Sequence, residues 1–418
     1  MIIWEINAHY SGSITSFIYL QKASGLWTTL YQMWKPVFLG SLVAWKIIAV
    51  FAAFQLLLMK IVPGKIASGP ITPQGNVPKY KDNGLSCFLI TTLLFLTLSK
   101  VFNLFSISIV YDNFAAIIGA LNLFSLFFCL FLYFKGRFFP NSTDSGGSNN
   151  FIFDYYWGME LHPRLLGWDI KQFTNCRFGK MSWPVIILSF AGKQADIYGL
   201  STSMVTAVII MMAYIAKFFI WERGYLSSMD IMHDRVGFMI CWGCLVWVPV
   251  VYTSPILYLV HHPIALSKPV ACLISILGLF FVIVNFLTDQ QRQMFREKNG
   301  QCKIFGKEPV KIEATYETEN KEQKKTYLLA SGWWGMSRHF RYLTEILAAL
   351  FWTLPAGLSS ILPYFYVTYL TILLLQRSYR IEVRCSKKYG TAWDQYKKLV
   401  PAYLFPPLRR KELQKQPQ

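Results

Sequence analysis

Residues 113–134, NFAAIIGALNLFSLFFCLFLYF, decide the fold class of this chain. The stretch carries no charged side chain, and it exceeds the roughly 20 residues that a helix needs to cross the hydrocarbon core of a bilayer. Comparable stretches occur at residues 37–59, 85–111, 198–221, 236–260 and 270–288, and others follow near 345–375. A shorter apolar run at 183–191 fits a half-helix or a buried piece. This pattern predicts an all-α, polytopic membrane protein with about eight to ten transmembrane helices.

The composition agrees with a membrane protein. Of 418 residues, 54% are hydrophobic and only 15% are charged, and the mean hydropathy is positive, all shifted away from the usage of soluble domains. The first twenty residues lack the basic start, apolar core and small-residue cleavage site of a secretory signal, so we expect the N-terminus to be retained.

The formal net charge of +19 could indicate a nucleic-acid partner. The basic residues, however, lie in loops between apolar stretches and in the C-terminal tail, as the positive-inside rule predicts for cytoplasmic segments. Residues 376–418 contain 11 basic residues against Glu382, Asp394 and Glu412. We therefore expect a cytoplasmic C-terminus, membrane lipid as the surrounding partner and no nucleic acid.

The eight cysteines are scattered along the chain. Cys241 and Cys244 lie in an apolar stretch without a second His or Cys pair at the spacing of a zinc site. We expect these thiols to pack as apolar side chains, and we expect neither a disulfide framework nor a metal site.

Two hydrophilic segments organise the chain. Residues 141–150, NSTDSGGSNN, have the composition of a mobile polar linker. The longest hydrophilic insert, residues 289–327, divides the chain into an N-terminal helical part, 1–288, and a C-terminal part, 289–418. Both parts are expected to belong to one integrated membrane domain.

Residues 331–342, SGWWGMSRHFRY, combine paired tryptophans with Arg338 and Arg341. Indole rings and guanidinium groups side by side can stack on and clamp a planar anion. The glycine-rich phosphate cradles GxGxxG and GxxxxGK[ST] do not occur in the required context. If a dinucleotide binds, side chains must hold its phosphates.

Basic residues at helical spacing could serve that purpose. Arg377, Arg380, Arg384 and Lys387 or Lys388 recur every three or four residues, so one helical face would present a ladder of cations, and Arg292 and Arg296 form a second pair. The same residues would also fit contacts with lipid headgroups, with the tryptophans as an interfacial belt. Sequence alone leaves both interpretations open.

Ionisable residues near apolar stretches are further candidates, because a charge in lipid is costly and usually faces a cavity or a partner. Asp230, His233 and Asp234 open the stretch that runs to Val260, where they could cap a helix or form a polar site. Tyr214 lies within an apolar stretch and could donate a proton or simply pack with one hydrogen bond. His261-His262-Pro263 could ligate a metal but fits a helix terminus better.

Motifs spread over most of the chain resemble those of the sterol reductase family, which includes the C14 and C7 reductases and the lamin B receptor. The N-terminal matches are Gly69-Pro-Ile-Thr-Pro-Gln-Gly75, His162-Pro-Arg164, Asn175-Cys-Arg-Phe-Gly179 and Met229-Asp-Ile-Met-His-Asp234. The C-terminal matches are Ser331-Gly-Trp-Trp-Gly335, Arg338-His339, Leu362-Pro-Tyr-Phe-Tyr366 and Lys388-Tyr-Gly390. Within the family, residues 302–313, CKIFGKEPVKIE, and the long insert are most similar to the reductases of 7-dehydrocholesterol.

The resemblance implies about ten transmembrane helices, sterol-facing helices in the N-terminal part, and a C-terminal pocket for NADPH. A sterol is the implied substrate. The cofactor contacts of the family fall here on Arg292, Arg296, Leu329, Trp334, Tyr342, Cys385, Ser386, Lys387, Lys388, Tyr389 and Tyr396, to which the residue pattern adds Arg338, Arg341 and Arg377.

The resemblance also implies a mechanism in which the alkene is protonated and then receives a hydride from NADPH. Tyr214 matches the mid-membrane tyrosine of the family and is the expected proton donor, with Asp230, His233 and Asp234 around it. One departure concerns an Arg-Asp-Glu motif that reads Arg380-Ile381-Glu382 here. An acid of the family is thus replaced by an apolar side chain, so Glu382 or Tyr214 takes over its role, or the activity is altered.

Other functions remain open at this point. Within the same class, the reduced bond could be at C14 or C24 of the sterol. Isoprenylcysteine-type membrane methyltransferases share an Arg-His motif and a C-terminal Val-Pro, and a non-catalytic sterol-binding protein is a third possibility. We expect a multi-pass protein of the endoplasmic reticulum in a eukaryote or of the inner membrane in a bacterium, in an oligomeric state that the sequence does not reveal.

Overall fold

The computed structural model describes residues 1–72, 74–317 and 323–407, and these residues form two compact units. The first unit comprises Met1–Leu277 and Leu350–Tyr366, and the second comprises Gly278–Ala349 and Val367–Gln418. The last part of the basic tail, residues 408–418, lies outside the described residues, as do residue 73 of the Pro-Gly loop and residues 318–322 of the insert. The sequence division at residue 288 differs from these units, because residues 350–366 group with the N-terminal part.

Six helical segments of the described residues are long and apolar enough to cross a membrane. They coincide with the six apolar stretches recognised in the sequence, which confirms those predictions and an integral membrane protein. A total of ten spans is not confirmed. The six segments are Leu42–Ile61, Gly84–Val101, Phe114–Phe138, Thr202–Ile220, Phe238–His261 and Lys268–Glu297.

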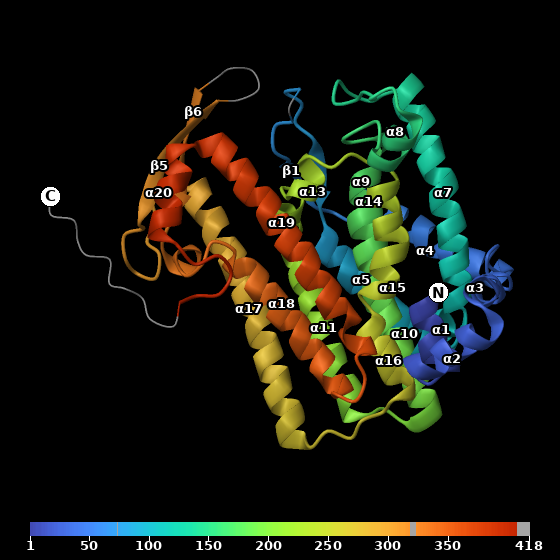
Figure 1. Ribbon diagram of the computed structural model, residues 1–418. Coiled ribbons are helices and arrows are strands. Elements are labelled where there is room, and N and C mark those ends of the chain that lie inside the picture. The colour runs from blue at the N-terminus through green and yellow to red at the C-terminus, as the bar shows by residue number, and fades with distance from the viewer. Residues whose placement is uncertain (73, 318–322, 408–418) are drawn as a thin grey trace. The chain divides into compact units, whose positions relative to one another are not determined.

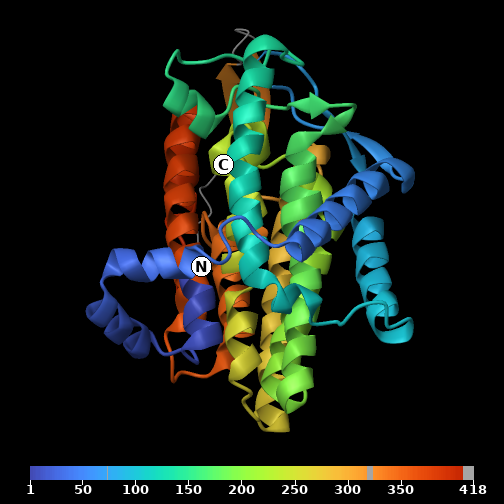
Figure 2. The ribbon, with the colours of Figure 1, turned by 90° about the vertical axis from the view of Figure 1, so that its right-hand side faces the viewer.

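The first unit is a bundle of helices (Figure 1), and its short helices α1–α3 lie to one side of the long helices α7 and α10 (Figure 2). Its helices are α1 (Ile2–His9), α2 (Ile14–Ser24), α3 (Leu26–Trp34), α4 (Leu42–Ile61), α5 (Gly84–Leu96), α6 (Ile109–Asp112), α7 (Phe114–Phe138), α8 (Phe151–Trp157), α9 (Ile170–Gln172), α10 (Met181–Tyr198), α11 (Thr202–Ile220), α12 (Glu222–Tyr225), α13 (Met229–Met232), α14 (Phe238–Trp242), α15 (Val248–Val251) and α16 (Ser254–His261). Helix α16 ends at His261, which confirms the helix-terminus interpretation of the His-His-Pro motif.

Helix α10 contains the apolar run 183–191 and forms the core of this unit. It contacts α5, α6, α11, α15 and α16, and its side chains Trp183, Ile187 and Phe190 are fully buried. It continues from a π-helical segment, η2 (Phe173–Lys180), which packs on a second one, η3 (Gly243–Trp247). A Cβ atom at Gly179 would lie 2.7 Å from the carbonyl oxygen of Cys244, so this close approach requires glycine.

The described residues are mostly helical, as predicted, and short antiparallel hairpins occur among the helices. They are β1–β2 (Lys65–Ser68 and Lys79–Asp82), β3–β4 (Arg164–Leu165 and Trp168–Asp169) and β5–β6 (Lys311–Glu317 and Gln323–Leu329). From the sequence, the hydrophilic insert at residues 289–327 was interpreted only as the boundary between the N-terminal and C-terminal parts. Ile312 and Ala314, however, alternate with exposed neighbours, and this period of two buries one face of a strand.

The segment 141–150 is also more ordered than its composition predicts. The buried carboxylate of Asp144 accepts hydrogen bonds from Thr72 Oγ1 at 2.7 Å and Asn76 Nδ2 at 2.7 Å. The backbone N–H of Asn141 donates to Glu160 Oε1 at 2.7 Å. Long-range partners for these polar groups fix the segment as a folded loop.

The second unit combines the β5–β6 hairpin with parts of three long helices and a C-terminal helix. Helices α17 (Lys268–Glu297), α18 (Phe340–Thr353) and α19 (Phe365–Tyr389) each cross the boundary between the units, and α20 (Thr391–Leu399) closes the described helices. The short turns are η4 (Gly332–Gly335) in this unit, η5 (Leu354–Ala356) and η6 (Leu362–Tyr364) in the first, and η1 (Thr97–Val101) after α5. Helix α20 packs on β5, as Figure 1 shows.

Candidate functional site

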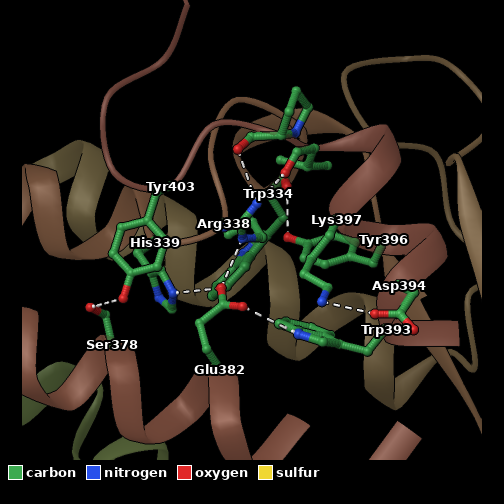
Figure 3. Close-up of polar contacts among 12 residues, drawn as sticks. Trp334, Arg338, His339, Ser378, Glu382, Trp393, Asp394, Tyr396, Lys397 and Tyr403 are labelled. Carbon is green, nitrogen blue, oxygen red and sulfur yellow. Dashed lines mark hydrogen bonds and ion pairs between the residues drawn. The ribbon is translucent and has the colours of Figure 1, made fainter. Parts of the chain in front are cut away.

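A carboxylate of the second unit gathers groups from the turn before α18 and from the helices α19 and α20 (Figure 3). Glu382, on α19, accepts hydrogen bonds at Oε1 from Arg338 Nε at 2.8 Å and from His339 Nε2 at 3.1 Å. Its other oxygen, Oε2, accepts from Trp393 Nε1 of α20 at 3.3 Å. The Arg338 guanidinium also donates to the carbonyl oxygens of residues 400 and 401, at 3.0 Å each. Glu382 therefore joins the segment before α18 to α19 and α20.

The hydrogen bonds keep Glu382 ionised. Burial alone would raise the pKa of this carboxyl, but the hydrogen bonds from His339 and Arg338 outweigh it and lower the pKa below its usual value of 4.5. A carboxylate in this state holds cations and does not readily give up a proton. The geometry thus favours a structural role for Glu382, and its catalytic role stays a prediction.

We predict that Glu382 makes the fold sensitive to acid. Because its folded pKa is depressed, its contribution to stability is present above pH 4.5 and is lost as the pH falls through the lower, folded pKa. Thermal unfolding of the wild type and of Glu382→Gln should be compared from about pH 7 to about pH 3. The wild type should lose more stability over the acid part of that range, and parallel curves would contradict the assignment.

An indole and a guanidinium form a stacked pair beside this network. The Arg292 guanidinium lies over the Trp334 ring, 4.5 Å from its centroid. Trp334 Nε1 donates to the carbonyl oxygen of Thr288 at 2.9 Å, and the Trp334 carbonyl accepts from the Tyr396 hydroxyl at 3.0 Å. Leu329 is buried in the apolar cluster on which Trp334 packs. One hydrogen bond thus fixes the indole ring, and the other fixes the backbone of the same residue.

A buried carboxylate that sequence reasoning missed orients the arginines. Asp289, fully buried on α17, pairs with Arg341 Nε at 3.0 Å and lies 3.9 Å from Arg292. Asn285 donates to the Arg341 carbonyl oxygen at 3.0 Å. The sequence did contain a signal for this carboxylate. Asp289 lies three residues before Arg292 at the end of an apolar stretch, where an unpaired charge would be costly.

Like charges act on Lys388 at the C-terminal end of α19. Burial lowers the pKa of Lys388, and the positive charges of Arg384 and Arg296 lower it further. Arg296 lies on α17, so the cluster draws on two helices. Mutual repulsion of this kind favours an anion as the partner. We call Arg296, Arg384 and Lys388 the cation cluster.

The remaining predicted cofactor contacts are divided. Helix α19 does carry Arg377, Arg380, Arg384, Lys387 and Lys388, as the helical ladder required. Cys385 and Tyr389 are partly buried against the core under β5, whereas Ser386 and Lys387 are exposed. Tyr342 is buried, and its ring stacks on the imidazole of His339 with an interplanar angle of 2°.

Tyr214 belongs to the first unit, where it lies in a cluster of aromatic rings. Its ring centroid is 5.0 Å from that of Trp352 and 5.7 Å from that of Trp183, and all three side chains are buried. Tyr252 and Tyr366 extend the cluster. Among the described residues, the indole nitrogens of Trp183 and Trp352 have no hydrogen-bond partner. Unpaired buried donors are rare and are typical of sites that receive a water or a ligand.

The acidic candidates of the first unit surround a buried lysine. Lys171 Nζ donates to the carbonyl oxygens of Ile231 at 2.7 Å and Asp234 at 2.5 Å. Burial lowers the pKa of Lys171 to about 7, although the charges of Asp169, Asp234 and Asp230 partly oppose this effect. The segment that contains Asp230, His233 and Asp234 is therefore anchored by Lys171, a contact that the sequence did not predict.

Comparison with known proteins gives concordant matches. The model of the "Ergosterol biosynthesis ERG4/ERG24 family" matches residues 1–408. A protein of Arabidopsis thaliana named 7-dehydrocholesterol reductase is 46% identical over 409 residues, which cover 97% of this chain and 93% of that protein. A Danio rerio protein of the same name is 37% identical, with coverages of 90% and 82%. A Delta(14)-sterol reductase of Methylotuvimicrobium alcaliphilum is 34% identical, with coverages of 97% and 90%.

Proposed function

Since this chain belongs to the ergosterol biosynthesis ERG4/ERG24 family of sterol reductases, we propose that it reduces the C7–C8 double bond of a sterol with NADPH as hydride donor. The observation that carries the choice of bond is the identity of 46%, over nearly the whole chain, to a 7-dehydrocholesterol reductase. Membership in this family makes a methyltransferase activity a poor alternative.

The second unit supplies residues that fit such a cofactor. The cation cluster offers three positive charges, which suit a phosphate group of NADPH. The Trp334 indole, whose Nε1 donates a hydrogen bond to the carbonyl oxygen of Thr288, and the Arg292 guanidinium offer flat surfaces for a planar ring. Arg338 and Tyr396 hold the surrounding backbone in place, and Arg341, Tyr342 and Arg377 are proposed as further contacts. Bound NADPH would supply the hydride.

The chain itself must supply a proton, because a carbon–carbon double bond without a polarising group accepts hydride poorly until it is protonated. We assign this step to Tyr214, whose O–H bond breaks as a C–H bond forms on the alkene. The other alkene carbon then carries the positive charge and accepts the hydride, so the net change is addition of one proton and one hydride. A dry aromatic cluster suits this step because it excludes water from the carbocation.

The proton lost by Tyr214 has to be replaced. Asp230, His233 and Asp234 are proposed as the polar groups that return it from solvent, with Lys171 fixing their segment. Ile381 cannot take part in proton transfer, and Glu382 is held ionised by Arg338 and His339. These two observations favour Tyr214 over Glu382 as the donor.

The orientation in the membrane follows from charge. We propose a cytoplasmic C-terminus, since residues 376–418 carry 11 basic residues against three acidic ones. A soluble dinucleotide would then reach the cation cluster from that side. In a eukaryotic cell the membrane of the endoplasmic reticulum is the proposed location.

The activity can be tested with the purified chain in lipid nanodiscs. With NADPH and 7-dehydrocholesterol, the absorbance of the conjugated diene should disappear, and chromatography should show one product reduced at C7. A C14 reductase is the second candidate, because relatives named Delta(14)-sterol reductase also match. Consumption of a C14-unsaturated sterol alone would favour that candidate. If neither substrate is consumed while sterol still binds, the proposal of an enzyme fails.

A further inference from the structure

The β5–β6 hairpin covers the end of α19 that carries the cation cluster. Residues 311–317 of β5 pair with residues 323–329 of β6 in an antiparallel register. The inner face of the hairpin buries Ile312, Ala314 and Leu328 against Trp393 and Tyr396 of α20. Cys385 and Tyr389 of α19 pack on the same cluster. The hairpin is therefore seated on the helices that carry the proposed cofactor contacts.

Tyr316 continues the inner face of β5, two residues beyond Ala314. Its half-buried ring lies under the ammonium group of Lys388, with Nζ 3.9 Å from the ring centroid. The ring also meets that of Tyr389 edge to face, at 5.9 Å between centroids. Lys388 Nζ lies 5.3 Å from the Tyr389 ring. Two tyrosines, one from the hairpin and one from α19, thus hold a single lysine.

This contact counteracts a repulsion within the cation cluster. Arg296 and Arg384 act on Lys388 with like charge, and a lysine side chain has a long, flexible stem that can swing away into solvent. The face of an aromatic ring attracts a cation. Tyr316 therefore keeps the third charge of the cluster in place before any anion arrives, and a preorganised site binds more tightly than one that must assemble.

We propose that Tyr316 is a positioning residue that sets cofactor selectivity: it holds Lys388 so that the cation cluster receives the 2′-phosphate by which NADPH differs from NADH. This inference rests on the proposed function. A phosphomonoester carries close to two negative charges near neutral pH and suits several converging cations. The hairpin thereby becomes part of the cofactor site, although its residues would not contact the reacting atoms.

The test compares the dissociation constants of NADPH and NADH, by calorimetric titration of the full chain in nanodiscs. Tyr316→Leu should weaken NADPH binding about threefold to tenfold, the size expected for one cation–ring contact, and should leave NADH binding unchanged. Tyr316→Phe keeps the ring and should retain the wild-type selectivity. Lys388→Met should lose NADPH affinity by about tenfold or more.

Two further variants separate positioning from a general effect on folding or charge. Because Tyr316 acts through Lys388, the double variant that combines Tyr316→Leu with Lys388→Met should bind NADPH no more weakly than Lys388→Met alone. Lys325→Met removes a cation from the outer face of the same hairpin, where Lys325 pairs with Glu313 at 2.9 Å, and should not change selectivity.

The outcomes distinguish this inference from the proposed function. If wild-type protein binds NADPH but Tyr316→Leu keeps its preference over NADH, the role of Tyr316 is overturned and the proposed function stands. An equal loss of affinity for both dinucleotides would also overturn it. If the wild type binds neither dinucleotide, the proposed function itself fails.

Discussion

Tyr214→Phe is expected to reduce the turnover number for sterol reduction by about 10²- to 10⁴-fold, the usual contribution of a positioned general acid. The substitution removes only the hydroxyl group, so the ring contacts with Trp183 and Trp352 should persist. Sterol and NADPH should therefore bind as before. Single-turnover decay of the diene absorbance, with both ligands saturating, measures the step directly.

Tyr252→Phe is the matched control for this prediction. Tyr252 lies in the same cluster, with its ring 5.5 Å from that of Trp183 and 4.7 Å from that of Tyr366. Loss of its hydroxyl should slow the reaction by less than about threefold, since it is not the assigned acid. Equal losses in the two variants would show that the hydroxyl groups support the cluster and would remove Tyr214 from its assigned role.

Glu222→Gln should destabilise the protein by about 3–5 kcal/mol, the cost of leaving one member of a buried ion pair without its partner. Arg177 and Glu222 are fully buried and form a bidentate ion pair, in which Arg177 Nη2 lies 2.9 Å from Glu222 Oε2. Arg177 Nη2 also donates to Asn83 Oδ1 at 2.9 Å. Removal of the carboxylate charge leaves the buried guanidinium without a counter-charge, which is unfavourable. Thermal unfolding in detergent measures the effect.

Two variants serve as controls for this ion pair. Asp112→Asn breaks an exposed pair with Lys193, which spans 2.7 Å, and should cost no more than about 1 kcal/mol because water screens it. The double variant Arg177→Met with Glu222→Leu should recover much of the lost stability, since it removes both buried charges. A Glu222→Gln protein as stable as Asp112→Asn would mean that the buried pair does not support the fold.

The transmembrane helices were the most predictable part of the fold. A stretch such as residues 113–134 must be helical in lipid, because no water is present to satisfy its backbone groups. The same reasoning fails for the hairpin at residues 311–329. Its strands are charged on the outer face. Ile312 and Ala314 form a buried inner face only because they pack on Trp393 and Tyr396, which are distant in the sequence.

The candidate site was predictable in part. Arg338, Trp334 and the basic residues of α19 were recognised as candidates because cations and indoles at short spacing can clamp a planar anion, and the resemblance to the family favoured this interpretation over contacts with lipid. Asp289 was missed because one buried acid carries no pattern of its own, and His339 was noted in a motif, but its contact with Glu382 was not predicted. Trp393 was missed for the same reason, and its contact with Glu382 depends on the turn between α19 and α20.

The sequence by itself determined the membrane class, the positions of six helices and the family, because each depends on local hydropathy or on residues that are close together along the chain. Only the tertiary structure decided which charges are paired. Glu382 could have been the acid that replaces the one lost at Ile381, yet Arg338 and His339 lie 2.8 and 3.1 Å from it and keep it ionised. The protonation state of a carboxyl depends on the charges and the burial around it in space, and neither can be read from the order of residues.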